Sequence, residues 1–240
     1  MTKQKVLILG NKNYHNLKLD RIIDSFDVIY RFNLACLGRN NGTKFGKLAM
    51  CSHVYQNFVS SPLSKKDIID IYQSDYTAEF VSNWYDFFQE NKHKFEEIFH
   101  QSEYKWQQWN GMLKDYGSRH RFSKMATTGY STIFTNLQDG DKDICVSGFT
   151  LCDKEIRQTI GEEDGFALEK NQGHGCHSFS EERDILAWLH VNQKIDASLC
   201  MLKDIQEPTL QENKYHTEAS EFILDLLRKE GYEDTRKSLG

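Results

Sequence analysis

Short apolar runs recur along the chain and are separated by longer, more polar stretches. The runs are rich in Val, Ile, Leu or Phe, which is typical of strands covered on both faces of a sheet. We therefore predict strands at residues 6–9, 28–32, 47–51, 78–81, 143–146 and 197–202.

Between these runs, apolar residues recur at the spacing that places them on one side of a helix. This pattern predicts helices at residues 17–25, 129–138, 180–192 and 217–229. Strands that alternate with helices indicate an α/β, Rossmann-like fold with a mostly parallel sheet flanked by helices. Ligands bind at the carboxyl ends of the strands in such sheets, so functional residues are expected directly after strands.

Two stretches depart from this alternation. Residues 83–123 hold Trp84, Trp106 and Trp109 without a clear strand, and we interpret them as a helical insertion. Residues 150–177 are rich in Gly and in charge, which is typical of a lid that orders over a ligand. A length of 240 residues suits one domain, so we expect residues 1–240 to form a single domain.

The composition narrows the class of protein. Hydrophobic residues make up 39% of the chain and charged residues 27%, which is typical of a soluble globular protein. A formal net charge of −5 gives no general attraction to nucleic acid or to an anionic membrane. No apolar run reaches spanning length, and the six cysteines form no CxxC pair. These features predict a cytoplasmic protein whose cysteines are reduced.

The first two predicted strands are each followed by an asparagine. The first ends in Gly10 and Asn11, whose backbone amides and short side chain can approach a nucleotide. The GxGxxG pattern is absent there, which argues against an NAD-dependent or methyl-donor enzyme, and a simple turn is the alternative. The second carries Arg31 and leads to Asn33; its alternative is a sheet edge with a solvated arginine.

A third segment, Thr127, Thr128 and Gly129, directly precedes or begins a predicted helix. Hydroxyl groups and amides at a helix N-terminus favour an anion such as a phosphate. An ordinary helix cap is the alternative interpretation.

A fourth segment places His177 shortly before a predicted helix, with Glu182 five residues further on. A histidine in such a place can act as a general base near neutral pH, and a surface-loop histidine is the alternative. His174 and Cys176 lie close in sequence, but a whole set of metal ligands is not visible.

An aspartate string at Asp139, Asp141 and Asp143 precedes a predicted strand. Its spacing fails the calcium-loop pattern, and it lies at the amino end of the strand, away from the expected site. We therefore interpret the string as a solvated turn and expect no metal and no cofactor.

The order of these segments along the chain resembles that of the CMP-sialic-acid-dependent sialyltransferases. Residues 7–46, with LILGN, IIDSFDVIYRFNLA and NNGTKFG, are similar to the large sialyl motif of the animal enzymes. TTG at 127–129 through DICVSGF at 143–149 resembles the small motif, and His177 with Glu182 matches the very small motif, His-x4-Glu. The segment HSFSEERDILAWL also resembles the base-bearing segment of the bacterial lipooligosaccharide enzymes.

This resemblance implies a variant of the GT-A glycosyltransferase fold and a metal-independent, inverting transfer of sialic acid. By it, Gly10, Asn11 and Asn33 contact the CMP moiety of the donor. Thr127, Thr128 and Gly129 hold its phosphate or ribose, and His174 is an additional phosphate contact. His177 takes the proton from the acceptor hydroxyl, with Glu182 in a supporting role.

The chain departs from the resemblance in two places. The stretch after the small motif has no tyrosine, whereas the bacterial enzymes hold the leaving phosphate with tyrosines there. Ser52 or His53 stands near the position of another nucleotide-binding asparagine of the family. The membrane anchor and the disulfide of the animal enzymes are not evident, so the chain looks more like the bacterial type.

Two rival functions stay open on the sequence. A CMP-Kdo-dependent transferase would use the same chemistry with another acidic sugar, and a non-catalytic CMP-sugar-binding relative would explain the missing tyrosines. The expected partners are the CMP-sugar donor and a glycan acceptor, for which a lipid-linked glycan is one option. A homo-oligomer is compatible with the sequence, no nucleic acid is expected, and membrane contact at the inner face of the cytoplasmic membrane would be at most peripheral.

Overall fold

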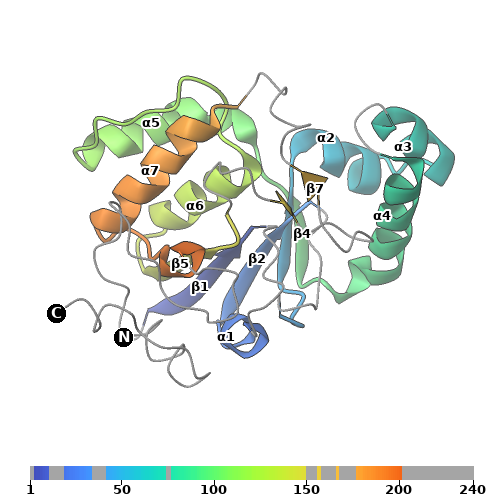
Figure 1. The fold of residues 1–240 in the computed structure, drawn as a ribbon, viewed down its shortest axis with the longest axis horizontal. Coiled ribbons are helices and arrows are strands. Elements are labelled where there is room, and N and C mark those ends of the chain that lie inside the picture. The colour runs from blue at the N-terminus through green and yellow to red at the C-terminus, as the bar shows by residue number, and fades with distance from the viewer. Residues whose placement is uncertain are drawn as a thin grey trace.

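The computed structural model describes residues 3–10, 19–33, 42–73, 77–149, 156–157, 166–167 and 177–201. Its centre is a five-stranded sheet in the order β4-β3-β2-β1-β5, and every neighbouring pair is parallel (Figure 1). The strands are β1 Gln4–Leu9, β2 Val28–Phe32, β3 Lys47–Met50, β4 Glu97–His100 and β5 Lys142–Ser147. The fold is therefore the α/β, Rossmann-like one expected from the alternating pattern.

The order of the strands creates a switch point between β1 and β5. From β1 the chain adds β2, β3 and β4 in succession on one side, and then returns to place β5 on the other side of β1. Ligands bind at such a point, outside the carboxyl ends of the strands, because the connections leave β1 and β5 in opposite directions. This edge of the sheet is therefore the first place to look for a site.

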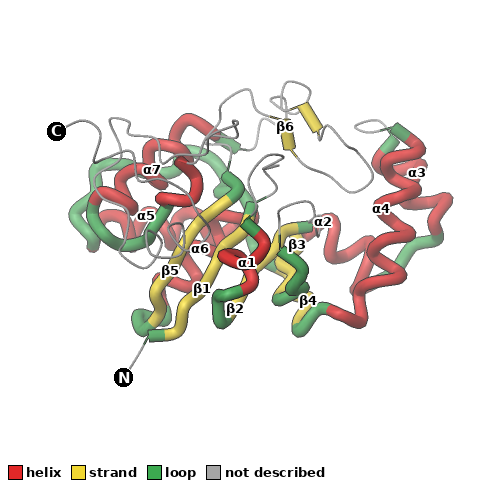
Figure 2. Tube along the Cα trace, turned by 60° about the horizontal axis from the view of Figure 1, so that its bottom comes forward, coloured by secondary structure: helices red, strands yellow, loops and turns green. Residues whose placement is uncertain are grey.

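The helices divide between the two faces of the sheet. After β1 come α1 Asp20–Asp24, α2 Ser52–Tyr55, the π-helix η1 Gln56–Ser60, α3 Lys65–Tyr72, α4 Ala78–Asn91 and the short 3-10 helix η2 Lys92–Lys94. After β4 come the 3-10 helix η3 Glu103–Lys105, then α5 Trp106–Asp115, α6 Thr128–Gln138, α7 Phe179–Val191 and the 3-10 helix η5 Ser198–Met201. In the two views of the fold, α5, α6 and α7 lie together on one side of the sheet, and α1 crosses the strands on the other side (Figures 1 and 2).

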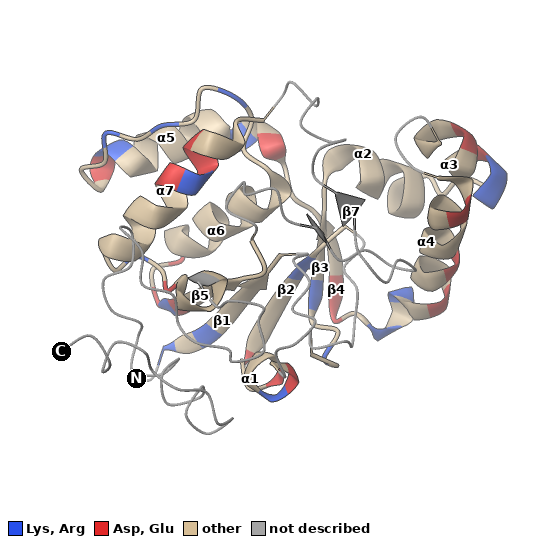
Figure 3. Cartoon of the chain, in the orientation of Figure 1, with Lys and Arg blue, Asp and Glu red and all other residues tan. Residues whose placement is uncertain are grey.

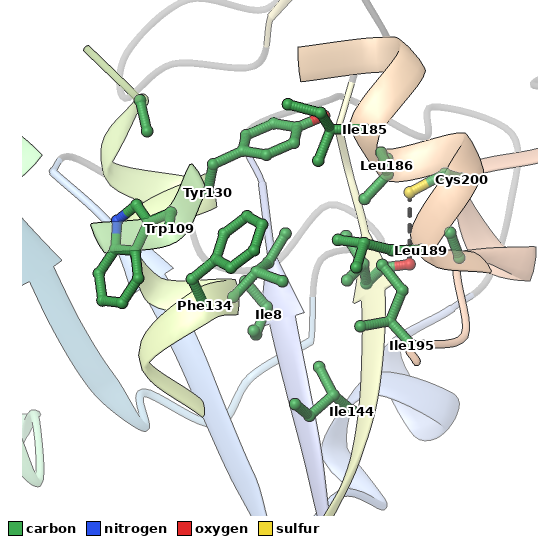
Figure 4. Close-up of a cluster of buried hydrophobic side chains, with 14 of the residues drawn as sticks. Ile8, Trp109, Tyr130, Phe134, Ile144, Ile185, Leu186, Leu189, Ile195 and Cys200 are labelled. Atoms are coloured by element: carbon green, nitrogen blue, oxygen red, sulfur yellow. Dashed lines mark hydrogen bonds between the residues drawn. The ribbon is translucent and has the colours of Figure 1, made fainter. Parts of the chain in front are cut away.

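The larger core lies between the sheet and α5, α6 and α7. Trp109 of α5 stacks on Phe134 of α6, with ring centroids 5.7 Å apart. Ile8 of β1 and Ile144 of β5 meet these rings from the sheet, and Leu189 of α7 closes the cluster (Figure 4). The core is completed by the segment after α7, where the thiol of Cys200 donates a hydrogen bond to the carbonyl of Val146 at 3.3 Å (Figure 4).

A second core joins β3 to α2, η1, α3 and α4. Leu48 and Met50 of β3 point into it, and Phe58 of the π-helix lies at its centre. The Phe58 ring lies 5.2 Å from that of Trp84 and 5.3 Å from that of Phe88, both on α4. Aromatic residues of the predicted insertion, Trp84 and Phe88 here and Trp109 in the larger core, therefore serve core packing.

Charged side chains lie mainly on the outer helices, whereas the buried helix α6 carries none (Figure 3). On α3, Lys65 pairs with Asp86 of α4 at 2.6 Å and Lys66 pairs with Asp70 at 2.7 Å. The string of Asp139, Asp141 and Asp143 lies between α6 and the start of β5, at the amino edge of the sheet, where the sequence placed it. Among the described residues, no helix combines the length and the apolar character needed to cross a bilayer.

Three predicted elements were wrong. Residues 78–81 begin α4 and are not a strand: the Thr77 hydroxyl accepts a hydrogen bond from the Phe80 amide and starts the helix. The predicted insertion at 83–123 is interrupted by β4, whose residues extend the sheet. Of the strand predicted at 197–202, the described residues form η5 Ser198–Met201, and the neighbouring Asp196 pairs with β5 in a bridge to Cys145.

Two further predictions are not tested by these elements. The predicted helix at 217–229 lies outside the described residues. Of the predicted lid at 150–177, the structure describes only the two-residue strands β6 Ile156–Arg157 and β7 Phe166–Ala167, which pair antiparallel, and His177 at its end.

Arg31 is buried and is not the solvated arginine of the alternative interpretation. It is 1% exposed, and its Nε and Nη2 atoms donate to the carbonyl of Lys44 at 3.1 and 2.8 Å. The carboxylate of Asp24 accepts from the amides of Thr43 and Lys44 and from the Thr43 hydroxyl. Burial alone would raise the pKa of Asp24, but these hydrogen bonds and the charge of Arg31 lower it below its usual value.

We expect Asp24→Ala to lower the free energy of unfolding by about 1–3 kcal/mol at pH 7, because hydrogen bonds to a charged acceptor are lost. A lowered pKa means that this contribution is present above the unfolded value of about 3.9 and is lost as the pH falls through the folded value. Urea unfolding at pH 7 and pH 3 checks this, with the exposed Asp115→Ala as the control. An equal deficit at both pH values would contradict it.

Candidate functional site at the carboxyl edge of the sheet

Gly10 and Gly148 bring the ends of β1 and β5 together at the switch point. The amide of Gly10 donates to the carbonyl of Ser147 at 2.7 Å. A Cβ atom on Gly10 would lie 2.4 Å from the Gly148 carbonyl oxygen, and one on Gly148 would lie 2.4 Å from that of Gly10. Gly148 also has a φ of +71°, which glycine adopts without strain. The main chains of Gly10 and Gly148 are therefore in contact, and main-chain atoms line this part of the carboxyl edge.

Phe149 follows β5 and connects two of the predicted site residues. Its ring lies 3.1 Å from the position of a Cβ atom on Gly10 and 2.8 Å from that of one on Gly129. The same ring meets Phe32 at the end of β2 and Tyr130 of α6, with centroids 6.1 and 5.7 Å away. Gly129 is thus a glycine because the Phe149 ring occupies the space of a side chain.

Asn33 fastens the end of β2 to the end of β3. Its φ of +48° is the left-handed conformation that asparagine tolerates better than most residues. The backbone amide of Asn33 donates to the Ala49 carbonyl at 2.9 Å, and its side-chain Oδ1 accepts from the backbone amide of Cys51 at 3.0 Å. Within the described part of the chain, the Nδ2 amide of Asn33 has no hydrogen-bond partner. It is therefore a donor at the carboxyl edge of the sheet.

The N-terminus of α6 is held from outside the helix. Thr127 is the N-cap residue, yet its hydroxyl makes no capping bond to the first turn. It instead donates to Glu182 Oε2 at 3.1 Å, while the Thr127 amide donates to Glu182 Oε1 at 2.6 Å. Thr128 begins the helix and is buried. Because the N-cap side chain is turned away, the first-turn amides of α6 lack the bond that a threonine cap usually supplies.

His177 lies beside the segment that leads into α6. Its Nδ1 atom is 2.8 Å from the carbonyl oxygen of Met125, two residues before the N-cap. A carbonyl can only accept, so Nδ1 carries the proton, and in the neutral ring Nε2 has the lone pair. The side chain is half-buried. This bond fixes the tautomer that a base acting through Nε2 requires.

Glu181 and Glu182 explain why the start of α7 stays beside α6. Glu182 is 3% exposed and bonds to Thr127, and Glu181 accepts from the Ser123 amide at 2.9 Å. With the bond of His177 to Met125, three side chains from the start of α7 contact residues 123–127. The His-x4-Glu spacing therefore lets the side chains of His177 and Glu182 contact the same short segment, residues 125–127.

The structure brings most of the predicted residues to one edge, at the ends of β1 and β2 and at the start of α6. These are Gly10, Asn33, Thr127, Thr128, Gly129, His177 and Glu182. Asn11 and His174 lie outside the described residues. Sequence reasoning missed Gly148 and Phe149 as site residues, although an aromatic side chain directly after Gly at the end of a buried strand was the signal available.

One further group at this edge, the Cys51 thiol, has defined chemistry. Burial raises the pKa of the Cys51 thiol to about 11, so the group is a thiol at neutral pH and not a nucleophile. Among the described residues, no three His, Cys, Asp or Glu side chains gather as a metal site would require. The part of this edge around α6 thus offers amide donors, hydroxyl groups and the oriented imidazole of His177.

Comparison with known proteins adds no identity. No protein-family model matches the sequence, and no curated protein matches it.

We expect Glu182→Ala to lower the free energy of unfolding by about 1.5–3 kcal/mol, because the amide and hydroxyl of the half-buried Thr127 lose a charged acceptor. Glu182→Gln retains an acceptor oxygen and should lose less. Glu181→Ala is the matched control, since it removes one bond to an exposed segment. Urea unfolding measures all three, and equal losses in Glu181→Ala and Glu182→Ala would contradict the central role of Glu182.

Proposed function

We propose that this protein is an inverting glycosyltransferase that transfers a sugar from a CMP-sugar donor to a hydroxyl group of a glycan acceptor. The proposed sugar is sialic acid. The observation that carries the proposal is the hydrogen bond of His177 Nδ1 to the Met125 carbonyl, which leaves Nε2 as the basic atom of the neutral ring. An oriented neutral imidazole beside a helix N-terminus is the arrangement that a base near an anionic leaving group needs.

The donor would bind along the switch point between β1 and β5. The Nδ2 amide of Asn33 supplies a donor for the nucleotide near the side-chain-free main chain of Gly10, and the first turn of α6 supplies amides for its phosphate. The ring of Phe149, which contacts the positions of Gly10 and Gly129, gives this edge an apolar surface. These groups favour an anionic nucleotide without contributing a base of their own.

In the proposed reaction, Nε2 of His177 removes the proton from an acceptor hydroxyl as its oxygen attacks the anomeric carbon. The new bond joins that oxygen to the sugar, and the bond between the anomeric carbon and the CMP phosphate oxygen breaks. CMP leaves with the bonding electrons from the opposite face, so the configuration inverts. Amides at the start of α6 would stabilise the negative charge that collects on the leaving phosphate.

The two rivals keep the same site. A CMP-Kdo-dependent transferase would differ only in the donor sugar, and a non-catalytic relative would bind CMP and not release it from a donor. The acceptor side of the proposal is a glycan, with a lipid-linked glycan of the kind found in lipooligosaccharide as one option. Contact with a membrane would then be peripheral and at its cytoplasmic face.

We expect the protein to release CMP from CMP-sialic acid, faster with a glycan acceptor than without, and to keep this activity in EDTA. The reason is that amides and hydroxyl groups, not a metal ion, are proposed to balance the leaving phosphate. Release from CMP-sialic acid and from CMP-Kdo is measured side by side by chromatography of free CMP.

The outcomes of this assay separate the alternatives. Faster CMP release from CMP-Kdo than from CMP-sialic acid would make Kdo the donor sugar in place of sialic acid. Tight CMP binding without CMP release would support the non-catalytic relative. Absence of both CMP binding and CMP release would overturn the proposed function. Complete loss of release in EDTA, restored by Mn²⁺, would contradict the metal-free mechanism alone.

We expect His177→Ala to bind CMP as the wild type does and to lose transfer by about 10²–10⁴-fold, because a general base contributes roughly that factor. His174→Ala is measured beside it. Near wild-type transfer by His177→Ala together with an inactive His174→Ala would assign the base to the other histidine.

A further inference from the structure

A second polar cluster lies further along the same edge, where β3 and β4 end side by side. Met50 and His100 are paired in the register of the two strands. Ser52 follows β3, and Glu103 follows β4. The Ser52 hydroxyl oxygen lies 2.6 Å from His100 Nε2 and 3.0 Å from Glu103 Oε2. We call Ser52, His100 and Glu103 the β3–β4 cluster.

The direction of the Ser52 hydroxyl determines which atoms of the cluster carry hydrogen. An ionised carboxylate can only accept, so the Ser52 hydroxyl donates to Glu103. Its single hydrogen is then used, and the short contact with His100 requires that Nε2 carry a proton and donate to Ser52. In the neutral ring the lone pair is therefore on Nδ1. Within the described residues, Nδ1 of His100 has no hydrogen-bond partner.

This geometry argues against a serine nucleophile. In a Ser-His-acid triad the acid orients the imidazole and the imidazole accepts the serine proton. Here Glu103 contacts the serine, and His100 donates to that serine. The cluster is instead a fixed set of acceptors, with Nδ1 of His100 and Oε1 of Glu103 as its outer atoms.

The surroundings of the cluster are aromatic and exposed. Tyr104, which follows Glu103, is 69% exposed, and the ring of Tyr55 lies 6.0 Å from that of His100. His100 is itself exposed, whereas Ser52 and Glu103 are half-buried. Ser52 also begins the helix that continues into the π-helix η1, and π-helical turns are found frequently at functional sites.

We propose that the β3–β4 cluster binds the acceptor glycan, with Glu103 and His100 accepting hydrogen bonds from two sugar hydroxyl groups. A sugar ring presents hydroxyl groups at its rim and C–H groups on its faces. A half-buried carboxylate and an exposed imidazole beside a tyrosine ring therefore suit it. Neighbouring strands lie about 4.8 Å apart, which puts the ends of β3 and β4 roughly 10 and 14 Å from that of β1. The cluster thus lies on the same edge, beyond Asn33 of the proposed nucleotide site, whose Oδ1 accepts from the amide of Cys51, the residue before Ser52. The assignment to an acceptor rests on the proposed function.

The test compares wild type with Glu103→Gln and His100→Ala. A matched control changes the same residue types at the opposite end of β4, in the double variant His93→Ala with Glu96→Gln, both exposed. The probes are lactose and an array of immobilised oligosaccharides, and sugar binding is measured without any donor. We expect the wild type and the control to bind the same sugars, and each cluster variant to lose affinity by at least about tenfold.

CMP affinity and CMP release without acceptor are measured on the same proteins. We expect the cluster variants to leave both unchanged, which also shows that they are folded, and to raise the KM for the sugar acceptor. Sugar binding that is absent in the wild type or unchanged in both cluster variants overturns the acceptor assignment. Absence of CMP binding and of CMP release in the wild type overturns the proposed function, and sugar binding then still decides whether the cluster holds a glycan.

Discussion

The geometry of the candidate site depends on one buried carboxylate. Glu182 is 3% exposed, and a charge so placed is costly unless hydrogen bonds replace its hydration. Thr127 provides these bonds through both its amide and its hydroxyl, and in this way the first turn of α7 is joined to the start of α6. Because α6 packs against β1, β2 and β3, the position of His177 follows from that of the sheet.

The rest of the edge is built mainly from main chain. Gly10 and Gly148 approach until their backbones touch, and Asn33 uses its side-chain oxygen to hold the amide that follows β3. The amides of Gly10, Asn33 and Cys51 are held by hydrogen bonds within this edge, so its shape does not depend on side-chain rotamers. It suits a ligand that is recognised by charge and shape, as a nucleotide phosphate is.

The strands that form the middle of the sheet could be predicted from sequence because each is a continuous apolar run buried on both faces. The edge strand β4 was missed since Glu97–His100 is short and half-exposed and lacks that pattern. Residues 78–81 were misread because a four-residue run with three apolar residues does not distinguish a strand from a helix. Phe80, Trp84 and Phe88, spaced four apart, belong to one buried helical face.

In the candidate site too, some residues could be predicted from local sequence patterns and other contacts could not. Asn33, Thr127 and His177 could be predicted because each lies directly after a strand or before a helix in a sequence pattern. The contacts of Phe149 with Gly10 and Gly129, and the meeting of Ser52 with His100, join residues far apart along the chain. No local pattern encodes such contacts, since they exist only once the strands have taken their order in the sheet.

The burial of the cysteines has a consequence for the way this protein can be handled and observed. Cys51 lies at the carboxyl edge beside the Asn33 side chain, and Cys145 lies within β5; burial raises the pKa of both thiols. Thiol reagents attack the thiolate, so the buried Cys145 does not react while the sheet is closed, and the half-buried Cys51 reacts slowly. The labelling rate of Cys145 therefore reports how often β5 opens to solvent next to β1, without any added probe.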